Sequence, residues 1–234
     1  MAIRRLYGSI PHLPGSRAAS DRTLSPAAAR RCLDPAAARP GDEVIVQEKL
    51  DGSCVAIVRG AAGRLEARGR EGRLAAESAN VGRRMFAAWV AENEARLDGL
   101  HLVDGEVLVG EWLALVHGTR YELAHELFVA FDLVRGPERI RAPLDALTAR
   151  LAPSGLRTPA VVHRGAPLAI TASCTLLGER GQHGAIDPPE GLVYRVERAG
   201  AVVLVAKWVR PDKVDGSYLP ENSGRDALYH QGSR

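Results

Sequence analysis

The sequence predicts an α+β fold in which two antiparallel β-sheets, flanked by a few helices, form a cleft between them. Two observations predict this class. Apolar, β-branched runs of strand length recur along the chain with short turns between them, as at residues 43–48 and 55–59. Helical periodicity is confined to a few segments, the longest of which covers residues 77–97. The sheets therefore make up the body of the protein, and the helices cover them.

Composition is that of an ordinary globular chain. The 234 residues are 46% hydrophobic and 25% charged, enough for one domain or one domain with a small appendage. The net charge of +3 permits a polyanionic partner without requiring one. Cys32, Cys54 and Cys174 are far apart and show no metal-binding spacing, so reduced thiols are expected. The chain shows neither an apolar run of membrane-spanning length nor a signal-peptide core, which predicts a soluble, cytoplasmic protein.

The other elements are expected in the following order. A short helix is predicted at residues 27–33 and a third strand at 65–70. In the helix over 77–97, Val81, Met85 and Trp89 recur at helical spacing and Ala88 widens the stripe, so these residues are expected to face the core. Further strands are predicted at 100–106, 107–115, 126–134, 160–163, 188–196 and 201–209, and short helices at 144–151 and 172–177.

We divide the chain into three parts. Residues 1–43 form an N-terminal segment that belongs to the domain or packs on it, residues 44–213 form the domain itself, and residues 214–234 form a polar tail that is expected to be loose.

A single lysine, Lys49, ends the first strong strand and is followed by Asp51 and Gly52. A lysine becomes a nucleophile only when burial or a neighbouring cation lowers its pKa. Gly52 lacks a side chain, so a phosphate or ribose could approach the backbone beside the lysine. On spacing alone, a surface lysine before a turn explains the pattern equally well.

Three more charged residues, Glu111, Glu190 and Lys207, lie on or at the mouth of separate apolar strands. Charges are rare in such positions unless they face a site. Carboxylates and cations in one cleft suit a triphosphate with a divalent metal ion, because the cations take phosphate oxygens and the carboxylates hold the metal. Phe131, in another apolar strand, is explained either by core packing or by stacking on a base.

Six motifs in a fixed order carry a resemblance to a known family. They are EKLDG (48–52), ARGR (67–70), GEWL (110–113), FVAFD (128–132), EGLVYR (190–195) and AKWVR (206–210). They resemble the nucleotidyltransferase motifs of covalent lysyl-adenylate ligases, and the ATP-dependent RNA ligase family most of all. The GEWL motif with His117 and Tyr121, and the early Pro11-His12-Leu13-Pro14, are similar to the small bacterial and phage RNA ligases. The resemblance covers about residues 11–213.

The resemblance implies an ATP-grasp-like nucleotidyltransferase domain with the nucleotide cleft between its sheets. It also implies an activity: Lys49 would attack the α-phosphate of ATP, expel pyrophosphate and hold AMP. The AMP would pass to the 5′-phosphate of an RNA, and a 3′-hydroxyl would displace it and seal the strand in RNA repair.

The resemblance further implies a binding site for the base and ribose. Glu48 and the backbone nearby would meet the adenine, and Phe131 would stack on it. Arg68 would hold the ribose or a phosphate, although Arg70 shares its strand face and is the alternative. Glu111 would bind the ribose hydroxyls.

The assignment of Glu111 has an alternative, and two further residues belong to the nucleotide site. Glu106 is a rival for Glu111, because DNA ligases show a similar Asp-Gly-Glu, but the following Trp112 favours Glu111. Asp51 and Gly52 complete the set of nucleotide-binding residues that the resemblance implies.

The phosphate site is implied in the same way. Lys207 would contact the α-phosphate, lower the pKa of Lys49 by like charge and stabilise the transition state. Glu190 would bind Mg²⁺ or Mn²⁺. Position 209 is valine where the family often has a second lysine. Arg210, although counted in the nucleotide site, would face the opposite side of a regular strand. A bulge, Lys213 or a single cation are the alternatives.

The tail after Lys213 has about 20 residues, too few for the oligonucleotide-binding barrel of DNA ligases and capping enzymes, so no such C-terminal domain is expected. A partner protein, a dimer or the N-terminal segment is then expected to supply substrate-binding surface. A DNA ligase-like enzyme is an alternative, as is a catalytically weak nucleotide- or RNA-binding relative, which Val209 favours.

Overall fold

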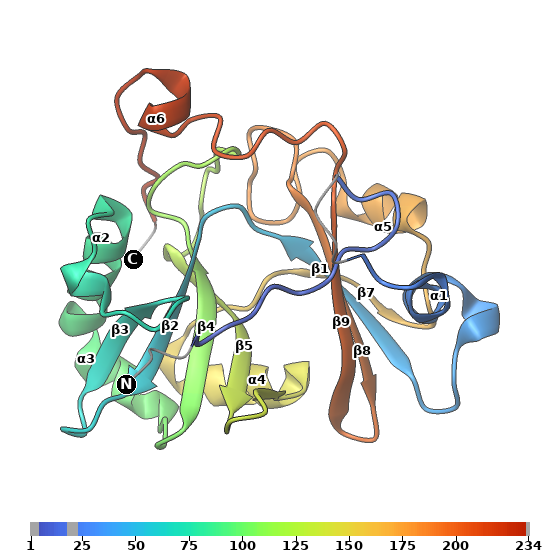
Figure 1. Cartoon of the computed structure of the whole chain (residues 1–234), viewed down its shortest axis with the longest axis horizontal. Helices are drawn as coiled ribbons and strands as arrows, with labels where there is room; N and C mark the ends of the chain where they lie inside the picture. The colour runs from blue at the N-terminus through green and yellow to red at the C-terminus, as the bar shows by residue number, and fades with distance from the viewer. Residues whose placement is uncertain (1–4, 18–22, 233–234) are drawn as a thin grey trace.

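The computed structural model describes residues 5–17 and 23–232, which form two antiparallel sheets with helices on their outer faces (Figure 1). This confirms the predicted α+β class. The first sheet has the strand order β7-β1-β8-β9, with β1 at Glu43–Lys49, β7 at Val161–Gly165, β8 at Gly191–Arg198 and β9 at Ala201–Val209. The second has the order β3-β2-β4-β5-β6, with β2 at Ser53–Arg59, β3 at Leu65–Gly69, β4 at Glu106–Trp112, β5 at Phe128–Arg135 and β6 at Ile140–Arg141.

Each sheet has its own helices and its own core. Helices α2 (Val81–Glu92), α3 (Glu94–Leu97) and α4 (Leu144–Leu151) bury apolar residues against the second sheet. Helices α1 (Pro26–Leu33) and α5 (Ile170–Leu177) do the same against the first. Helix α6 (Pro220–Ser223) follows β9, and short 3₁₀ turns lie at Pro35–Ala37, Ala75–Glu77, Asp98–Leu100 and Ala152–Ser154. Within the described ranges, no helix is long and apolar enough to cross a membrane.

The helix predicted over residues 77–97 is shorter and is rotated relative to the prediction. Its fully buried face consists of Gly82, Phe86 and Val90. Val81 and Ala88, expected in the core, are exposed, and Met85 and Trp89 are only partly buried. Phe86 packs against Trp112 of β4 with ring centroids 5.3 Å apart. The aromatic contact with the sheet thus sets the rotation of the helix, and the helical spacing alone could not reveal it.

The strand predicted at residues 100–106 is wrong. Residues 98–100 form a 3₁₀ turn, and His101 (φ 47) and Gly105 (φ +80) both adopt left-handed backbone conformations that an extended strand excludes. β4 therefore begins at Glu106 and ends at Trp112, three residues before the predicted end at 115.

The chain after Lys213, expected to be loose, packs back on the body of the protein. The backbone N–H of Tyr218 donates to the carbonyl of His117 at 2.7 Å, and that of His230 donates to the carbonyl of Ala114 at 2.9 Å. His230 is itself buried, and its Nε2 accepts from the N–H of Tyr121 at 2.9 Å. This segment therefore holds the loop that follows β4.

The described part of the N-terminal segment joins the two sheets. Residues 11–17 run along β9, where the N–H of Lys207 donates to the carbonyl of Pro11 at 2.9 Å and the N–H of Leu13 donates to the carbonyl of Lys207 at 2.8 Å. Residues 5–10 pass across to the second sheet (Figure 1), where the N–H of Leu6 donates to the carbonyl of Arg70 at 2.9 Å. The segment thus spans the space between the sheets.

Candidate active site

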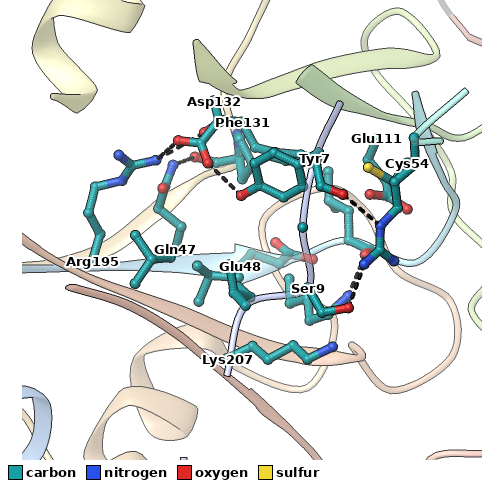
Figure 2. Close-up of a pocket in the computed structure, with 18 residues that line it drawn as sticks. Tyr7, Ser9, Gln47, Glu48, Cys54, Glu111, Phe131, Asp132, Arg195 and Lys207 are labelled. Atoms are coloured by element: carbon teal, nitrogen blue, oxygen red, sulfur yellow. Dashed lines mark hydrogen bonds and ion pairs between the residues drawn. The ribbon is translucent and has the colours of Figure 1, made fainter. Parts of the chain in front are cut away.

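A cavity lies between the two sheets and is closed on one side by residues 7–10 of the N-terminal segment (Figure 2). Its lining includes five of the residues that the sequence analysis singled out: Glu48, Lys49, Glu111, Phe131 and Lys207. The strands that carry them are β1, β4, β5 and β9. The structure therefore brings side chains from both sheets to one place.

Strand alternation explains why these side chains meet. Gln47 and Lys49 occupy alternate positions of β1, and both line the cavity. The side chain of the preceding Val46 points to the opposite face of the sheet and packs in the core there. Val193 on β8 and Lys207 on β9 are direct cross-strand partners, so their side chains share the inner face.

Phe131 reaches the cavity because β5 contains a β-bulge. On β4, Val109 pairs with Asp132 and Gly110 pairs with Ala130, so Phe131 has no partner and is the extra residue. A bulge changes the direction of consecutive side chains, and both Phe131 and Asp132 line the cavity. The Phe131 ring stands edge-on to Tyr7, with ring centroids 5.4 Å apart.

Lys49 is held by a buried ion pair. Its Nζ lies 2.7 Å from Oε2 of Glu190, and the side chains are 19% and 10% exposed. Burial lowers the pKa of Lys49, but the carboxylates of Glu190 and Glu111 outweigh it and raise the pKa above its ordinary value. Burial raises the pKa of Glu190. The expected lowering of the Lys49 pKa is therefore not found in this structure.

The pKa that is lowered by a neighbouring positive charge is that of Lys207. Burial lowers the pKa of Lys207, and the neighbouring Lys49 lowers it further. Two cations thus face one end of the cavity, where an anionic ligand would neutralise them.

Glu111 lies beside this cation pair. Its Oε1 accepts from the N–H of Gly52 at 2.9 Å, and burial raises its pKa to about 8. The structure requires a glycine at position 52 for a reason different from the predicted one. A Cβ there would lie 2.6 Å from the carbonyl oxygen of Trp112, so Gly52 permits close approach of β4 rather than of a ligand. The rival residue Glu106 lies at the other end of β4, paired with Arg135 and Arg150.

Glu48 lines the cavity, but its carboxylate faces a loop. Oε2 accepts from the N–H of Gln182 at 2.6 Å, and Oε1 has no partner among the described residues. Burial raises the pKa of Glu48 to about 7, although the N–H groups of Gln182 and His183 lower it. Any contact between Glu48 and a ligand in the cavity would come from its backbone.

Besides Arg68 and Glu190, three of the predicted cationic and acidic residues lie outside the cavity lining. Lys213 Nζ is buried 2.5 Å from Oδ2 of Asp51 and 2.8 Å from Oγ1 of Thr119. Arg210 donates through Nε to the carbonyl of Pro189 at 3.1 Å, and its N–H donates to the carbonyl of Glu190 at 3.1 Å. These residues support the turns that carry Lys49 and Glu190.

Of the two candidate arginines of β3 and its end, Arg70 is the one that lines the cavity. Its Nε donates to the carbonyl of Tyr7 at 3.1 Å, and Nη2 donates to Oγ of Ser9 at 2.5 Å. Arg68, the favoured alternative in the sequence, pairs with Glu66 through Nε at 3.0 Å and is not part of the lining. β3 ends at Gly69, so Arg68 lies within the strand and Arg70 lies just beyond its end.

A buried polar network at the far wall was not predicted. Arg195 Nη2 lies 2.5 Å from Oδ1 of Asp132, and the hydroxyl of Tyr7 donates to Oδ2 of Asp132 at 2.5 Å. Arg195 and Asp132 are charged residues inside apolar strands, the signal that identified Glu111, so the sequence could have revealed them. Tyr7 carries no comparable signal.

Metal binding by protein side chains alone is not supported. In the part of the chain that the structure describes, no group of three or more His, Cys, Asp or Glu side chains is placed to hold a metal ion. A single carboxylate such as Glu190 suits Mg²⁺ or Mn²⁺ only where substrate phosphates supply further oxygens.

The double-sheet domain thus places a buried lysine, Lys49, near the carboxylates of Glu190 and Glu111 and near a second lysine, Lys207. A family model described as RNA ligase matches residues 42–209, and the chain therefore belongs to the RNA ligase family. No curated protein matches the chain.

Solved structures of RNA ligases are similar in fold. An archaeal ATP-dependent RNA ligase is 17% identical with a TM-score of 0.44, covering 72% of this chain and 42% of its own. The Naegleria gruberi RNA ligase with PPi is 16% identical with a TM-score of 0.49, covering 79% of this chain and 53% of its own. A mutant of the Naegleria enzyme with ATP and Mn is 17% identical with a TM-score of 0.48, covering 79% and 52%. The present chain thus spans about half the length of these structures.

Proposed function

We propose that this protein is an ATP-dependent RNA ligase that forms a covalent lysyl-AMP intermediate at Lys49. The observation that supports it most directly is that Lys49 and Lys207 line one cavity, while Nζ of Lys49 lies 2.7 Å from the buried carboxylate of Glu190 behind that lining. Membership of the RNA ligase family supports the same reaction.

The cavity walls suggest how ATP would lie. The adenine would stack on Phe131 of one sheet, opposite the apolar Val193 and Val205 of the other. The ribose hydroxyls would meet the Glu111 carboxyl, which can donate as well as accept because its pKa is raised to about 8. Arg70, in place of Arg68, would contact the ribose or a phosphate.

The phosphates would bind near Lys49 and Lys207, at the other end of the cavity. In the first step Nζ of Lys49 would form a bond to the α-phosphorus, and the bond to the bridging oxygen of the leaving pyrophosphate would break. Nζ must be unprotonated for this, yet in the structure Glu190 holds its proton in place. Activation therefore requires that Glu190 be drawn away from Lys49.

Glu190, together with phosphate oxygens, would hold a divalent metal ion, Mg²⁺ or Mn²⁺, which would supply neutralisation of the phosphate charge. A Glu190 carboxylate engaged in this way would no longer pair with Lys49. Once Lys49 has lost its counter-ion, its buried position and the neighbouring charge of Lys207 favour loss of the proton from Nζ. Lys207 would then donate to the α-phosphate and stabilise the charge that develops there.

The later steps would use an RNA as acceptor. AMP would pass from Lys49 to a 5′-phosphate, and a 3′-hydroxyl would displace AMP to seal a break, which is the chemistry of RNA repair. A partner protein or a second copy of the chain would supply further RNA-binding surface.

Covalent labelling tests the first step. Wild-type protein incubated with ATP labelled at the α-phosphate and either Mg²⁺ or Mn²⁺ should retain label after denaturation. Lys49→Ala should retain none, and Lys207→Ala should reduce the labelling rate about 100-fold or more, as expected for removal of a group that stabilises developing charge. A wild-type chain that takes no label with either metal would contradict the enzyme assignment.

Two matched variants and two acceptors sharpen the test. Lys213→Met removes a buried lysine outside the cavity, so any folded fraction of it should still take label, unlike Lys49→Ala. Labelled protein offered 5′-phosphorylated RNA or DNA of the same sequence should transfer AMP to RNA preferentially. Transfer to DNA alone would favour a DNA ligase-like enzyme.

A further inference from the structure

His12 lies beside Lys207 at the edge of the first sheet, next to the residues that line the cavity but not among them. The two residues form a parallel bridge, flanked by hydrogen bonds from the N–H of Lys207 to Pro11 and from the N–H of Leu13 to Lys207. Directly paired residues of adjacent strands point to the same face, and Lys207 lines the cavity. Ile10, two positions earlier in the segment, lines the cavity as well, whereas Leu13 is 1% exposed and packs in the core on the outer face.

The hydrogen bonds of His12 fix which ring nitrogen can donate to a ligand. Nδ1 of His12 lies 2.7 Å from Oγ of Ser16, and that oxygen accepts from the N–H of Val209 at 2.9 Å. The Ser16 hydroxyl is thus left to donate, and its near acceptor is Nδ1, since the carbonyl of Val209 is 3.5 Å away. The neutral imidazole then carries its proton on Nε2, which has no partner among residues 5–17 and 23–232.

The electrostatic setting of His12 calls for an anion. Its pKa is lowered by burial and then by the charges of Lys207 and Lys49, both of which lie near enough to act on it. An anionic group placed near these three side chains would relieve the repulsion between the two lysines and could accept a hydrogen bond from the neutral His12.

The order of the strands decides which anion this is. β1 with Lys49 is separated from β9 with Lys207 by β8, and the segment that carries His12 lies beyond β9. In phosphoryl transfer the attacking and leaving groups lie roughly in line on opposite sides of the phosphorus. With Lys49 as nucleophile and Lys207 at the α-phosphate, the leaving group departs toward His12.

We propose that His12 is a catalytic residue that donates a hydrogen bond from Nε2 to the β- and γ-phosphates of ATP and to the pyrophosphate that leaves. This role rests on the proposed function for the identity of the nucleotide. It assigns to the N-terminal segment a part of the phosphate site that the second lysine of the family motif, absent at Val209, does not provide.

Equilibrium binding tests the contact without any chemistry. We expect His12→Ala to weaken binding of a non-hydrolysable ATP analogue about 10-fold to 100-fold, the usual effect of losing a hydrogen bond to a charged group, and to leave AMP binding unchanged. His12→Gln carries an N–H near the position of Nε2 and should recover part of the affinity. His12→Asn replaces only Nδ1 and should behave as His12→Ala.

The reaction steps give a second measurement. His12→Ala should slow both lysyl-AMP formation from ATP and its reversal by added pyrophosphate. It should leave unchanged the sealing of an RNA that already carries AMP on its 5′-phosphate, because that step involves no pyrophosphate. A purely structural role would slow all three steps together and would lower the midpoint of thermal unfolding.

Equal loss of AMP and ATP-analogue binding, or full retention of both, would overturn the assignment of His12. Failure of the proposed function is a separate outcome: wild-type protein would then bind the analogue but take no covalent label. The binding comparison still tests His12 in that case.

Discussion

The buried carboxyl of Glu111 shows how a single residue links the site to stability. Burial raises its pKa to about 8, whereas an unfolded chain has a value near 4.5. Between these values the folded protein holds a proton that the unfolded chain has released, so stability falls as pH rises from about 5 to 8. Glu111→Gln cannot ionise but keeps an acceptor for the N–H of Gly52. We expect its unfolding free energy to decrease less steeply with pH than that of wild type, by up to about 1.4 kcal/mol per pH unit. Urea unfolding from pH 5 to pH 9 measures it.

Glu106 of the same strand is the matched control, with the opposite sign. Burial would raise its pKa, but hydrogen bonds from Arg135 and Arg150 hold it below its ordinary value. Its contribution to stability is present at neutral pH and is lost as pH falls through its lowered pKa, so Glu106→Gln should lower stability at neutral pH and change the slope of the profile only on its acid side. If Glu111→Gln and wild type lose stability in parallel from pH 5 to pH 8, the assigned pKa of Glu111 is wrong.

At the scale of elements, the turn after β1 is tied to the chain that follows β9. Nζ of Lys213 is fully buried and contacts Asp51, 162 positions away in the sequence. Asp51→Asn leaves a buried ammonium without a counter-ion, and Lys213→Met leaves a buried carboxylate, so each should cost about 3–5 kcal/mol of unfolding free energy. The double variant should cost clearly less than the sum.

A double-mutant cycle by urea unfolding measures this coupling. Arg30 and Asp34, an exposed pair at positions i and i+4 of the first helix and its cap, provide the control cycle, in which coupling of about 0.3–0.5 kcal/mol is expected. Additive effects at Asp51 and Lys213 would show that the contact does not hold the Lys49 turn.

The elements around the site show what the sequence could and could not predict. The pattern of apolar residues within each segment identified the long strands, because such a pattern depends only on neighbouring positions. Charged residues within or at the ends of these strands then predicted that Lys49, Glu111 and Lys207 face one cleft. The bulge that turns Phe131 into the cavity depends on the register between β4 and β5, and the choice of Arg70 over Arg68 depends on where β3 ends. Such pairings between distant segments have no local signature.

For the whole molecule, the key question is what holds the two sheets at a fixed separation around the cavity. Arg195 of β8 in the first sheet lies 2.5 Å from Asp132 of β5 in the second, and both side chains are 2% exposed. Arg195 also donates to the carbonyls of Phe131 and Ala142 at 3.1 and 3.2 Å. The hydroxyl of Tyr7, in the N-terminal segment, also donates to Asp132. This network joins both walls of the cavity at one point.

Removing the arginine should therefore loosen the whole molecule. Arg195→Met is expected to cost about 3–5 kcal/mol, because it leaves the buried carboxylate of Asp132 with weaker compensation from Arg141 and Tyr7. Arg164→Met breaks an Arg–Asp pair of similar length, 2.6 Å to Asp145, but with side chains 35% and 76% exposed, and should cost less than about 1 kcal/mol. Urea unfolding compares them. Because the pair also fixes the width of the cavity, Arg195→Met should weaken binding of the ATP analogue while Arg164→Met leaves it unchanged; equal behaviour of the two variants would show that the sheets are held together elsewhere.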